Sequence, residues 1–470
     1  EYELTDSTAP TWGTSPITIN SGANFANSTK LHIDLSPVEE GSGLEKMSVQ
    51  LTREVDGETS ALYPTDYNWQ NYEIGFDFEL SDLPDQYVGN GTYTLYIALK
   101  DKSGNISEKT SKAITITDLV TSLSGVLTGD RLHLTKENSP YIVEADCLVS
   151  EGDTLVIDPG VEVRFASGVD DSGNKKLYSI SISGSIEARG TAEEKILFTK
   201  TDDNEGLQSE KWNSTTQRYE YGTSYWNGIA INGGSVSTEN TYNYVSGNIL
   251  EYCEFEYADT PLTIKAGAYI NKCHFHDCTN YVTKEGEASY STVMVNNVFE
   301  SGVRLSRKCL FVNNKVSTYF NTNEMYSWDS GKIINNTFTD TSVTFEWSSY
   351  AYIQNNVFEN CSVTISSSLQ YDDYAPTVTN NNFIDCSSPI VSTTQEYQSG
   401  KSYNFTHNYW GSAQTDELNS KGATANISFI SDYYDNFKYA RIDYSNWATE
   451  AFENCGYSET GFVAFDYAVN

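Results

Sequence analysis

Short runs of alternating apolar and polar residues mark the first part of the chain, for example Leu31–Leu35, Met47–Leu51 and Tyr93–Ile97. Alternation with period two over about five to eight residues is typical of β-strands that pack one face on a core. The segment Gly89–Gly91 precedes the last of these runs and favours a turn, because Gly and Asn tolerate positive φ. Roughly six or seven such strands predict a small β-sandwich over residues 1–118.

The second half of the chain repeats a short motif of the form Asn-Asn-x-Phe. Its anchor recurs at steps of 17 to 27 residues, about 22 on average, and the flanks alternate as strands without helical periodicity. A repeat of about this length with short strands and a fixed turn predicts a parallel β-helix with one coil per repeat. The anchors are Phe255, Phe275, Phe299, Val316, Phe338, Phe358, Phe383 and Trp410.

Two positions of the repeat predict ladders inside the coils, because stacked coils place equivalent side chains about 4.8 Å apart. The anchor rings would stack, and the residues two positions earlier would form a hydrogen-bonded amide ladder. A third position holds small residues, among them several of the eight cysteines, which we expect to be buried core thiols rather than disulfides or reactive groups. The ladder positions are Cys253, Cys273, Asn297, Asn314, Asn336, Asn356, Asn381 and Asn408.

Two segments of the first region, Gly41–Val49 and Gly91–Asn105, resemble bacterial Ig-like domains of surface and secreted proteins. The resemblance implies a spacer or adhesive module rather than a catalytic one. Asp101 and Asn105 could bind Ca²⁺, but stabilisation of the turn between them is the simpler interpretation.

The segments Leu155–Phe165, Ile180–Ala188 and Trp226–Ile231 resemble the opening coils of bacterial right-handed parallel β-helix repeat proteins, and Asn408–Gly411 resembles their final turn. The resemblance covers about residues 120–435 and implies an all-β, pectin lyase-like, right-handed single-stranded parallel β-helix. It says little about function, because the family includes polysaccharide lyases, hydrolases, epimerases and non-enzymatic surface proteins.

The predicted organisation is therefore an Ig-like sandwich over 1–118, the β-helix over 119–435 and a cap over 436–470. The cap would cover the open end of the solenoid, which otherwise exposes strand edges.

The 470 residues carry a formal net charge of −35, spread almost evenly along the chain. Such a field repels polyanions and argues against a nucleic-acid partner. No apolar run is long enough to span a membrane. The chain begins at Glu1 rather than Met, which suggests a processed or trimmed N-terminus, and no signal peptide is visible in it. The resemblance to bacterial surface and secreted proteins implies an extracellular or cell-surface location, and we expect the protein to be a monomer.

Paired carboxylates are candidates for glycoside cleavage. Pectin-hydrolase relatives carry Asn-Thr-Asp, Asp-Asp, Gly-His-Gly and Arg-Ile-Lys signatures. This chain has Asp170-Asp171, Asp202-Asp203 and Asp372-Asp373 but neither of the last two signatures. Adjacent strand residues point to opposite faces, so each pair would contribute one group to a site. We expect the first two pairs to be solvated loop acids and assign no catalytic residue.

The densest set of metal-ligand types is the segment Cys273–Cys278. If Cys273 and Phe275 face inward, His274 and His276 face outward together and could share a metal ion. A third ligand is not evident from the sequence, and no CxxC pair supports a structural zinc site. We therefore expect surface decoration and assign no metal or cofactor; Ca²⁺ stays open without a clear motif.

A small cationic island occupies Ser301–Asn323, which holds Arg304, Arg307, Lys308 and Lys315 without an acid. It could hold an anionic sugar, with an arginine as the base of a lyase-type elimination. The favoured interpretation is that these cations neutralise acids on adjacent coils.

Aromatic residues follow on the next coils, among them Tyr326, Trp328 and Trp347. Val343 and Phe345 suit the interior and leave Glu346 facing outward. Such rings beside a carboxylate suit sugar rings, and packing under loops explains them equally well. The candidate ligand-binding residues are Arg304, Arg307, Tyr326, Trp328, Glu346 and Trp347.

The leading hypothesis is glycan binding or adhesion on a β-helix platform. The alternatives are a polysaccharide lyase or glycoside hydrolase with a groove near Arg304, and a structural spacer. An enzyme would bring together acids or basic residues with perturbed pKa values in one groove, whereas a binder would present aromatic residues without them.

Overall fold

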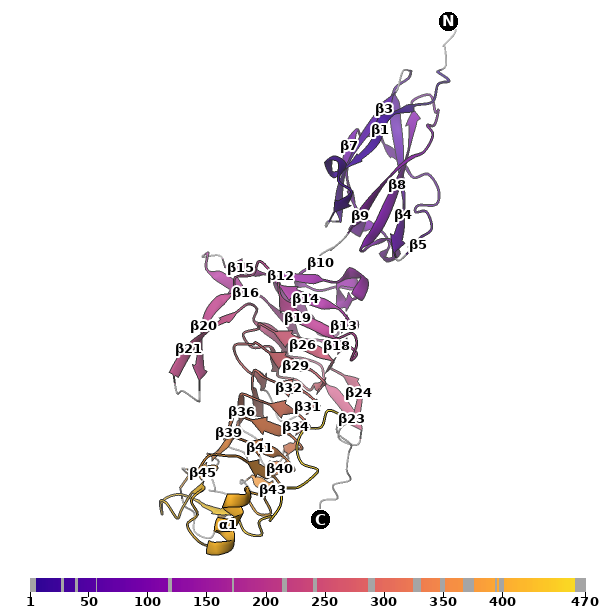
Figure 1. The fold of residues 1–470 in the computed structure, drawn as a ribbon. Coiled ribbons are helices and arrows are strands. Elements are labelled where there is room, and N and C mark those ends of the chain that lie inside the picture. The colour runs from indigo at the N-terminus through magenta and orange to yellow at the C-terminus, as the bar shows by residue number, and fades with distance from the viewer. Residues whose placement is uncertain are drawn as a thin grey trace. The chain divides into compact units, whose positions relative to one another are not determined.

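The computed structural model describes residues 6–26, 29–38, 41–55, 57–116, 121–170, 173–213, 218–239, 243–285, 292–323, 331–346, 351–366, 376–393, 395–396 and 401–460. The chain forms two compact units (Figure 1), which are described separately. The first comprises Glu1–Thr121 with Glu137–Pro140, and the second Ser122–Lys136 with Tyr141–Asn470.

The first unit is a two-sheet β-sandwich. Its core contains the predicted alternating residues, and Leu31, Ile33 and Tyr93 are all fully buried. Tyr93 Oη donates to the carbonyl oxygens of Tyr87 and Gly89, at 2.9 and 2.7 Å, as in the tyrosine corner of Greek-key sandwiches. One sheet is β1 (Thr11–Ile19), β3 (Lys30–Val38) and β7 (Gly75–Glu79); the other is β2 (Phe25–Ala26), β9 (Thr110–Ile116), β8 (Gly91–Asp101), β4 (Leu44–Val55) and β5 (Glu58–Thr59), with β6 (Trp69–Asn71) on β4.

The second unit is a parallel β-helix, as the repeat predicts. Each coil contributes one strand to each of three parallel ladders, in the chain order C, B, A, and ladders A and B join through β12 (Tyr141–Val149). Ladder A is β17 (Ser179–Ile182), β22 (Gly228–Ile231), β27 (Leu262–Ile264), β30 (Val282–Lys284), β33 (Val303–Ser306), β36 (Tyr319–Asn323), β39 (Ser342–Phe345), β42 (Ser362–Ile365), β45 (Val391–Thr393) and β47 (Ile430–Ser431). Ladder B is β14 (Glu162–Phe165), β19 (Ile196–Lys200), β26 (Cys253–Glu256), β29 (His274–His276), β32 (Val298–Phe299), β35 (Lys315–Val316), β38 (Thr337–Thr339), β41 (Val357–Glu359) and β44 (Asn382–Ile384).

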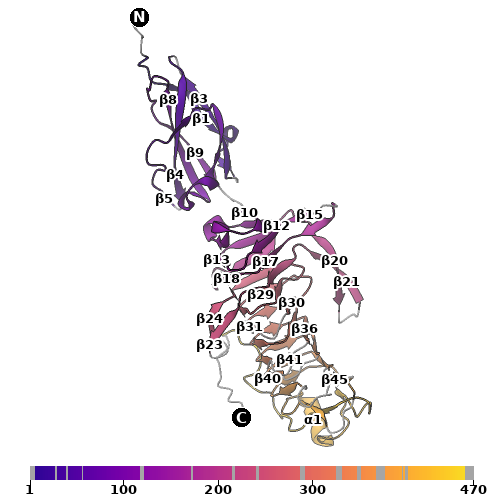
Figure 2. The same cartoon turned by 180° about the vertical axis from the view of Figure 1, so that it is seen from behind.

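Ladder C forms a separate sheet of the β-helix. Three antiparallel hairpins extend from the early coils (Figure 2): β15 (Ser167–Val169) with β16 (Lys175–Leu177), β20 (Leu207–Asn213) with β21 (Arg218–Ser224), and β23 (Val236–Glu239) with β24 (Asn243–Gly247). Ladder C is β11 (His133–Leu134), β13 (Thr154–Ile157), β18 (Ser185–Arg189), β25 (Ile249–Glu251), β28 (Tyr269–Asn271), β31 (Thr292–Val295), β34 (Cys309–Val312), β37 (Lys332–Ile334), β40 (Tyr352–Gln354), β43 (Thr377–Thr379), β46 (Ser402–Asn404) and β48 (Arg441–Asp443).

The remaining elements are short. No helix in the described part of the chain is long and apolar enough to cross a membrane. They are β10 (Thr121–Val126), the 3₁₀ turns η1 (Asn20–Gly22), η2 (Leu80–Asp82), η3 (Asp85–Tyr87), η4 (Gly129–Leu132) and η5 (Lys136–Asn138), and the helix α1 (Ser412–Lys421).

Both predicted interior ladders are confirmed. From Asn297 to Asn408, each buried amide donates through Nδ2 to Oδ1 of the next ladder Asn at 2.9–3.1 Å, and that Oδ1 also accepts the preceding backbone N–H. The anchor rings stack at centroid distances of 4.6–5.1 Å, except around Val316, where Phe311 and Phe320 fill the space from neighbouring ladders.

The cysteines are also as predicted, since all eight are free and seven are buried; Cys455 is half-buried. Burial raises the pKa of the Cys309 thiol to about 12, although the Lys284 charge opposes the shift, so this thiol stays protonated. The interior of the solenoid is therefore a packed core of amides, rings and thiols.

The predicted cap over 436–470 is wrong in its boundary and in its form. Ladder C continues to Asp443 in β48, and α1 already contributes Leu418 to the solenoid core. Beyond β48 the chain runs back beside earlier coils (Figure 1): Phe452 exchanges two hydrogen bonds of 2.9 Å with the Asn382 side chain. Ser458 N–H donates to Asn313 Oδ1 at 2.8 Å, so the described C-terminal segment is an axial strap.

Candidate functional site

The predicted cationic island lies partly on the outer face of ladder A. Arg304, on β33, is half-buried and stands in register between Thr283 and Asn321. Arg304, Lys308 and Lys315 form no ion pair with a described residue, so the described part of the chain does not support the favoured neutralisation of acids on adjacent coils for these three cations. Arg307 follows β33 in a left-handed conformation, with φ of 55°.

Two tyrosines flank Arg304 on the same ladder. Tyr281 directly precedes β30, and Tyr319 begins β36, two coils further along the axis. Their ring centroids are nevertheless only 5.3 Å apart. The coil between them has Gly302 at the equivalent position, with φ of 86°, and a Cβ there would lie 2.9 Å from the Tyr319 carbonyl oxygen. The rings therefore lean together over a position that only glycine fills easily.

The electrostatics connect Tyr319 with two of the predicted charged residues, Arg304 and Glu346. The pKa of Tyr319 is raised to about 12, mainly by burial and also by the charges of Tyr281 and Glu346, whereas the Arg304 charge and the Asn321 hydrogen bond oppose the shift. Glu346 follows β39 and is half-buried, while Val343 and Phe345 are fully buried, as predicted. Arg304 and Glu346 thus both lie near enough to Tyr319 for their charges to affect its pKa.

Polar groups continue this surface along the axis. Tyr319 pairs in register with Ser342, and Ser342 with Ser362. The buried Asn321 Oδ1 accepts no hydrogen bond from the described residues. A hollow of about 270 Å³ lies beside the first residues of β39 and β42. It is lined by Asp340, Thr341, Ser342, Asn360, Cys361, Ser362 and Ser387.

Three of the candidate residues, Tyr326, Trp328 and Trp347, lie outside the described residues, as do Asp171 and Asp372-Asp373. The other acidic candidates stabilise turns or face solvent. Asp170 and Asp101 each accept two hydrogen bonds from an Asn four residues on, which confirms the turn role for Asp101 and Asn105. Asp202 and Asp203 are exposed.

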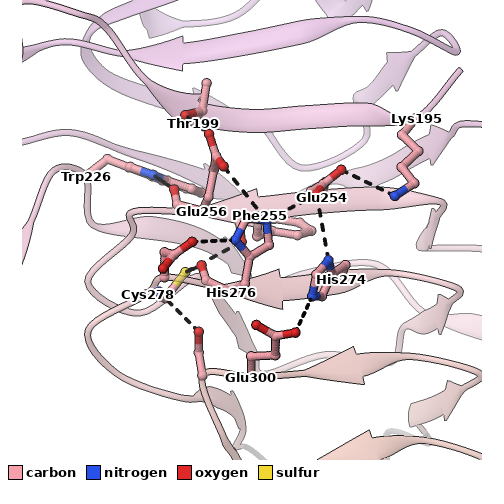
Figure 3. A network of polar contacts seen from close by, with 12 residues as sticks. Lys195, Thr199, Trp226, Glu254, Phe255, Glu256, His274, His276, Cys278 and Glu300 are labelled. Carbon is pink, nitrogen blue, oxygen red and sulfur yellow. Dashed lines mark hydrogen bonds and ion pairs between the residues drawn. The ribbon is translucent and has the colours of Figure 1, made fainter.

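The outer face of ladder B holds a second cluster, which includes Glu254, His274 and His276 (Figure 3). The register pairs Glu254 with His274 and Glu256 with His276, so alternation puts all four side chains on one face, while Phe255 and Phe275 are fully buried and point inward. The outward placement of both histidines is as predicted. Their ring centroids lie 4.5 Å apart.

Glu254 is the residue that the sequence analysis missed. Its Oε1 lies 3.1 Å from His276 Nε2 and 3.7 Å from His274 Nδ1, and the three side chains place one potential ligand atom each within 4.8 Å of one another. Its Oε2 lies 3.4 Å from Lys195 Nζ. Burial raises the pKa of Glu254, but the Lys195 charge and the His276 hydrogen bond lower it by more, so the carboxylate is held ionised.

Carboxylates also occupy the opposite side of each imidazole. Asp277 Oδ2 lies 2.7 Å from His276 Nδ1, and Glu300 Oε1 lies 3.3 Å from His274 Nε2 (Figure 3). Burial lowers the pKa of His276, but the hydrogen bonds to Asp277 and Glu254 raise it above its ordinary value. Each ring is thus held between two acids.

Comparison with known proteins finds only remote structural similarity. No family model matches the chain. No curated protein matches it either. Among solved structures, it is similar to pectate lyase PelI from Erwinia chrysanthemi in complex with tetragalacturonic acid, at 9% identity and a TM-score of 0.17 over 94% of this chain and 99% of that one. It is also similar to a family 28 exopolygalacturonase from Yersinia enterocolitica, at 10% identity and a TM-score of 0.18 over 85% and 89%. Likeness this remote carries no argument about the site.

Proposed function

We propose that this protein binds a polysaccharide or glycoconjugate on the outer face of ladder A, around Tyr281, Arg304, Tyr319 and Glu346. The observation that carries the proposal is the half-buried tyrosine pair beside an arginine that has no ion-pair partner among the described residues. An extracellular or cell-surface location, a monomeric state and the Ig-like character of the sandwich belong to the same proposal.

The chemistry of this surface suits a sugar. Aromatic rings offer flat apolar faces to the C–H faces of a pyranose, and guanidinium, carboxylate and amide groups bond its hydroxyls or an acidic substituent. Asn321 adds a buried acceptor without a donor among the described residues, which a hydroxyl could satisfy. Because these groups repeat along the axis at about the coil spacing of 4.8 Å, they favour an extended chain over a compact ligand.

The test is binding of the full chain to a panel of plant, algal and host glycans, followed by calorimetry with the best binder. Tyr319→Ala should weaken binding about tenfold, because it removes both the ring and its pairing with Tyr281. Tyr352→Ala is the matched control, since Tyr352 is a half-buried outward tyrosine on ladder C.

Two outcomes would overturn the proposal: no glycan binds, or Tyr319→Ala binds as tightly as the wild type. The same samples should be assayed for new reducing ends and unsaturated products. Cleavage would replace simple binding by the lyase or hydrolase alternative.

A further inference from the structure

We propose that Glu254, His274 and His276 form a binding site for a divalent first-row transition-metal ion of the Zn²⁺ class on the outer face of ladder B. The site is separate from the proposed glycan surface and does not depend on it. It draws its ligands from two adjacent strands, β26 and β29, whose register sets their spacing.

The ligand spacing fits a small ion. With metal–ligand bonds of about 2.0–2.1 Å, two ligands of a tetrahedral site lie about 3.4 Å apart. Glu254 Oε1 lies 3.1 Å from His276 Nε2 and 3.7 Å from His274 Nδ1, on either side of that value. Two imidazole nitrogens and one carboxylate oxygen are the donors of many zinc and non-haem iron sites, which keep a further position open.

The outer contacts fit the same assignment. Metal-binding histidines usually donate their other ring N–H to a carboxylate, which fixes the tautomer and raises the basicity of the ligating nitrogen. His276 Nδ1 is hydrogen-bonded to Asp277, and His274 Nε2 lies 3.3 Å from Glu300 Oε1 as an ion-pair contact without hydrogen-bond geometry, which leaves Nε2 and Nδ1 respectively to face Glu254. Both rings are therefore oriented toward one carboxylate oxygen.

Charge favours a dication as well. Glu254, Glu256, Asp277 and Glu300 surround the pair of rings, and Lys195 is the cation in contact with Glu254. Protonating both rings instead would place two positive charges side by side at 4.5 Å between centroids. One dication can offset much of this acidic charge while leaving both imidazoles uncharged.

The neighbouring cysteines do not complete the site. Cys273 and Cys278 lie in the same segment, but both are buried and their thiols donate to interior carbonyl oxygens of Leu250 and Phe255. The donor set is thus nitrogen and oxygen, and Glu256 Oε2, 3.8 Å from His276 Nε2, is a further carboxylate beside the nitrogen that faces Glu254.

The experiment is calorimetric titration of the full chain, cleared of metal by a chelator, with ZnCl₂. We expect one Zn²⁺ per chain and at least about tenfold weaker binding in His274→Gln and in His276→Gln. His133→Gln is the matched control, because His133 also lies outward on a ladder strand and contacts one acid, Asp158, at 3.0 Å. Its zinc affinity should equal that of the wild type.

A second measurement is the visible absorption of the Co²⁺-loaded chain, which should show ligand-field bands that His276→Gln abolishes. Asp277→Asn tests a positioning residue: the bands should persist while affinity falls about tenfold. Circular dichroism confirms that each variant is folded. Absence of zinc binding, unchanged affinity in His274→Gln, or Ca²⁺ binding as tight as Zn²⁺ would each overturn the proposal.

Discussion

The outer faces of ladders A and B are made by the same coils and share one interior, yet they carry different chemistry. Around Tyr281 and Tyr319, ladder A presents rings, an arginine and hydroxyls. Around His274, ladder B presents two imidazoles among acids. The repeat restrains only inward positions, where amides and rings must stack, so outward positions can differ from one ladder to the next. In this solenoid, the chemistry of the surface therefore differs between faces and between coils.

The largest effect should come from the interior that both faces share. Phe358 stacks between Phe338 and Phe383 at 5.0 and 4.9 Å and is fully buried. Phe358→Ala should destabilise the solenoid by about 3–5 kcal/mol, because it leaves a cavity in a packed core. Thermal unfolding of the solenoid transition measures this; a loss below about 1 kcal/mol would contradict the packed interior.

A change on ladder B alone should separate the two faces. Substitution of His274 by Gln removes one metal ligand and should weaken zinc binding at least about tenfold, with glycan affinity unchanged. Parallel titrations with ZnCl₂ and with the best glycan measure both. Loss of glycan binding in this variant would show that the faces are coupled.

The reciprocal change is Tyr319→Ala on ladder A. We expect about tenfold weaker glycan binding and zinc affinity equal to that of the wild type, because Tyr319 belongs to none of the contacts around His274. The same pair of titrations is the readout. Equal losses of both ligands would indicate general unfolding and sink the separation.

The smallest effect should follow Gly302→Ala. A Cβ at this left-handed position costs about 1 kcal/mol and would press on Tyr319, so the tyrosine pair should open slightly. We expect a modest drop in melting temperature and a few-fold loss of glycan affinity, with no change in zinc affinity. A variant that binds glycan as well as the wild type would show that the close approach of the rings is unimportant.

The interior was predictable from sequence and the faces only partly. The Asn and Phe ladders follow from the repeat, because a stacked coil gives the same inward position to the same residue type. The last coil, α1 and the strap were not foreseen, since the segment after Trp410 carries no repeat. Nor could the sequence show that Phe311 and Phe320, from other ladders, fill the place of Val316.

The position of Glu254 beside the two histidines could have been inferred from the sequence. The anchors Phe255 and Phe275 are one coil apart, so aligning them places Glu254 beside His274 and Glu256 beside His276. Within the segment Cys273–Cys278 alone, only i, i+2 neighbours lie close on one face, so that segment does not contain the third ligand. In a solenoid, ligands should be sought one repeat away, because strand spacing brings those residues within about 5 Å.

The most direct test of this account is a zinc titration of Glu254→Gln beside Glu359→Gln. Both glutamates lie outward on ladder B, but only Glu254 lies between the two imidazoles. We expect at least about tenfold weaker zinc binding for Glu254→Gln and wild-type affinity for Glu359→Gln. Equal affinities in the two variants would contradict the claim that the register of adjacent coils builds a metal site on this face.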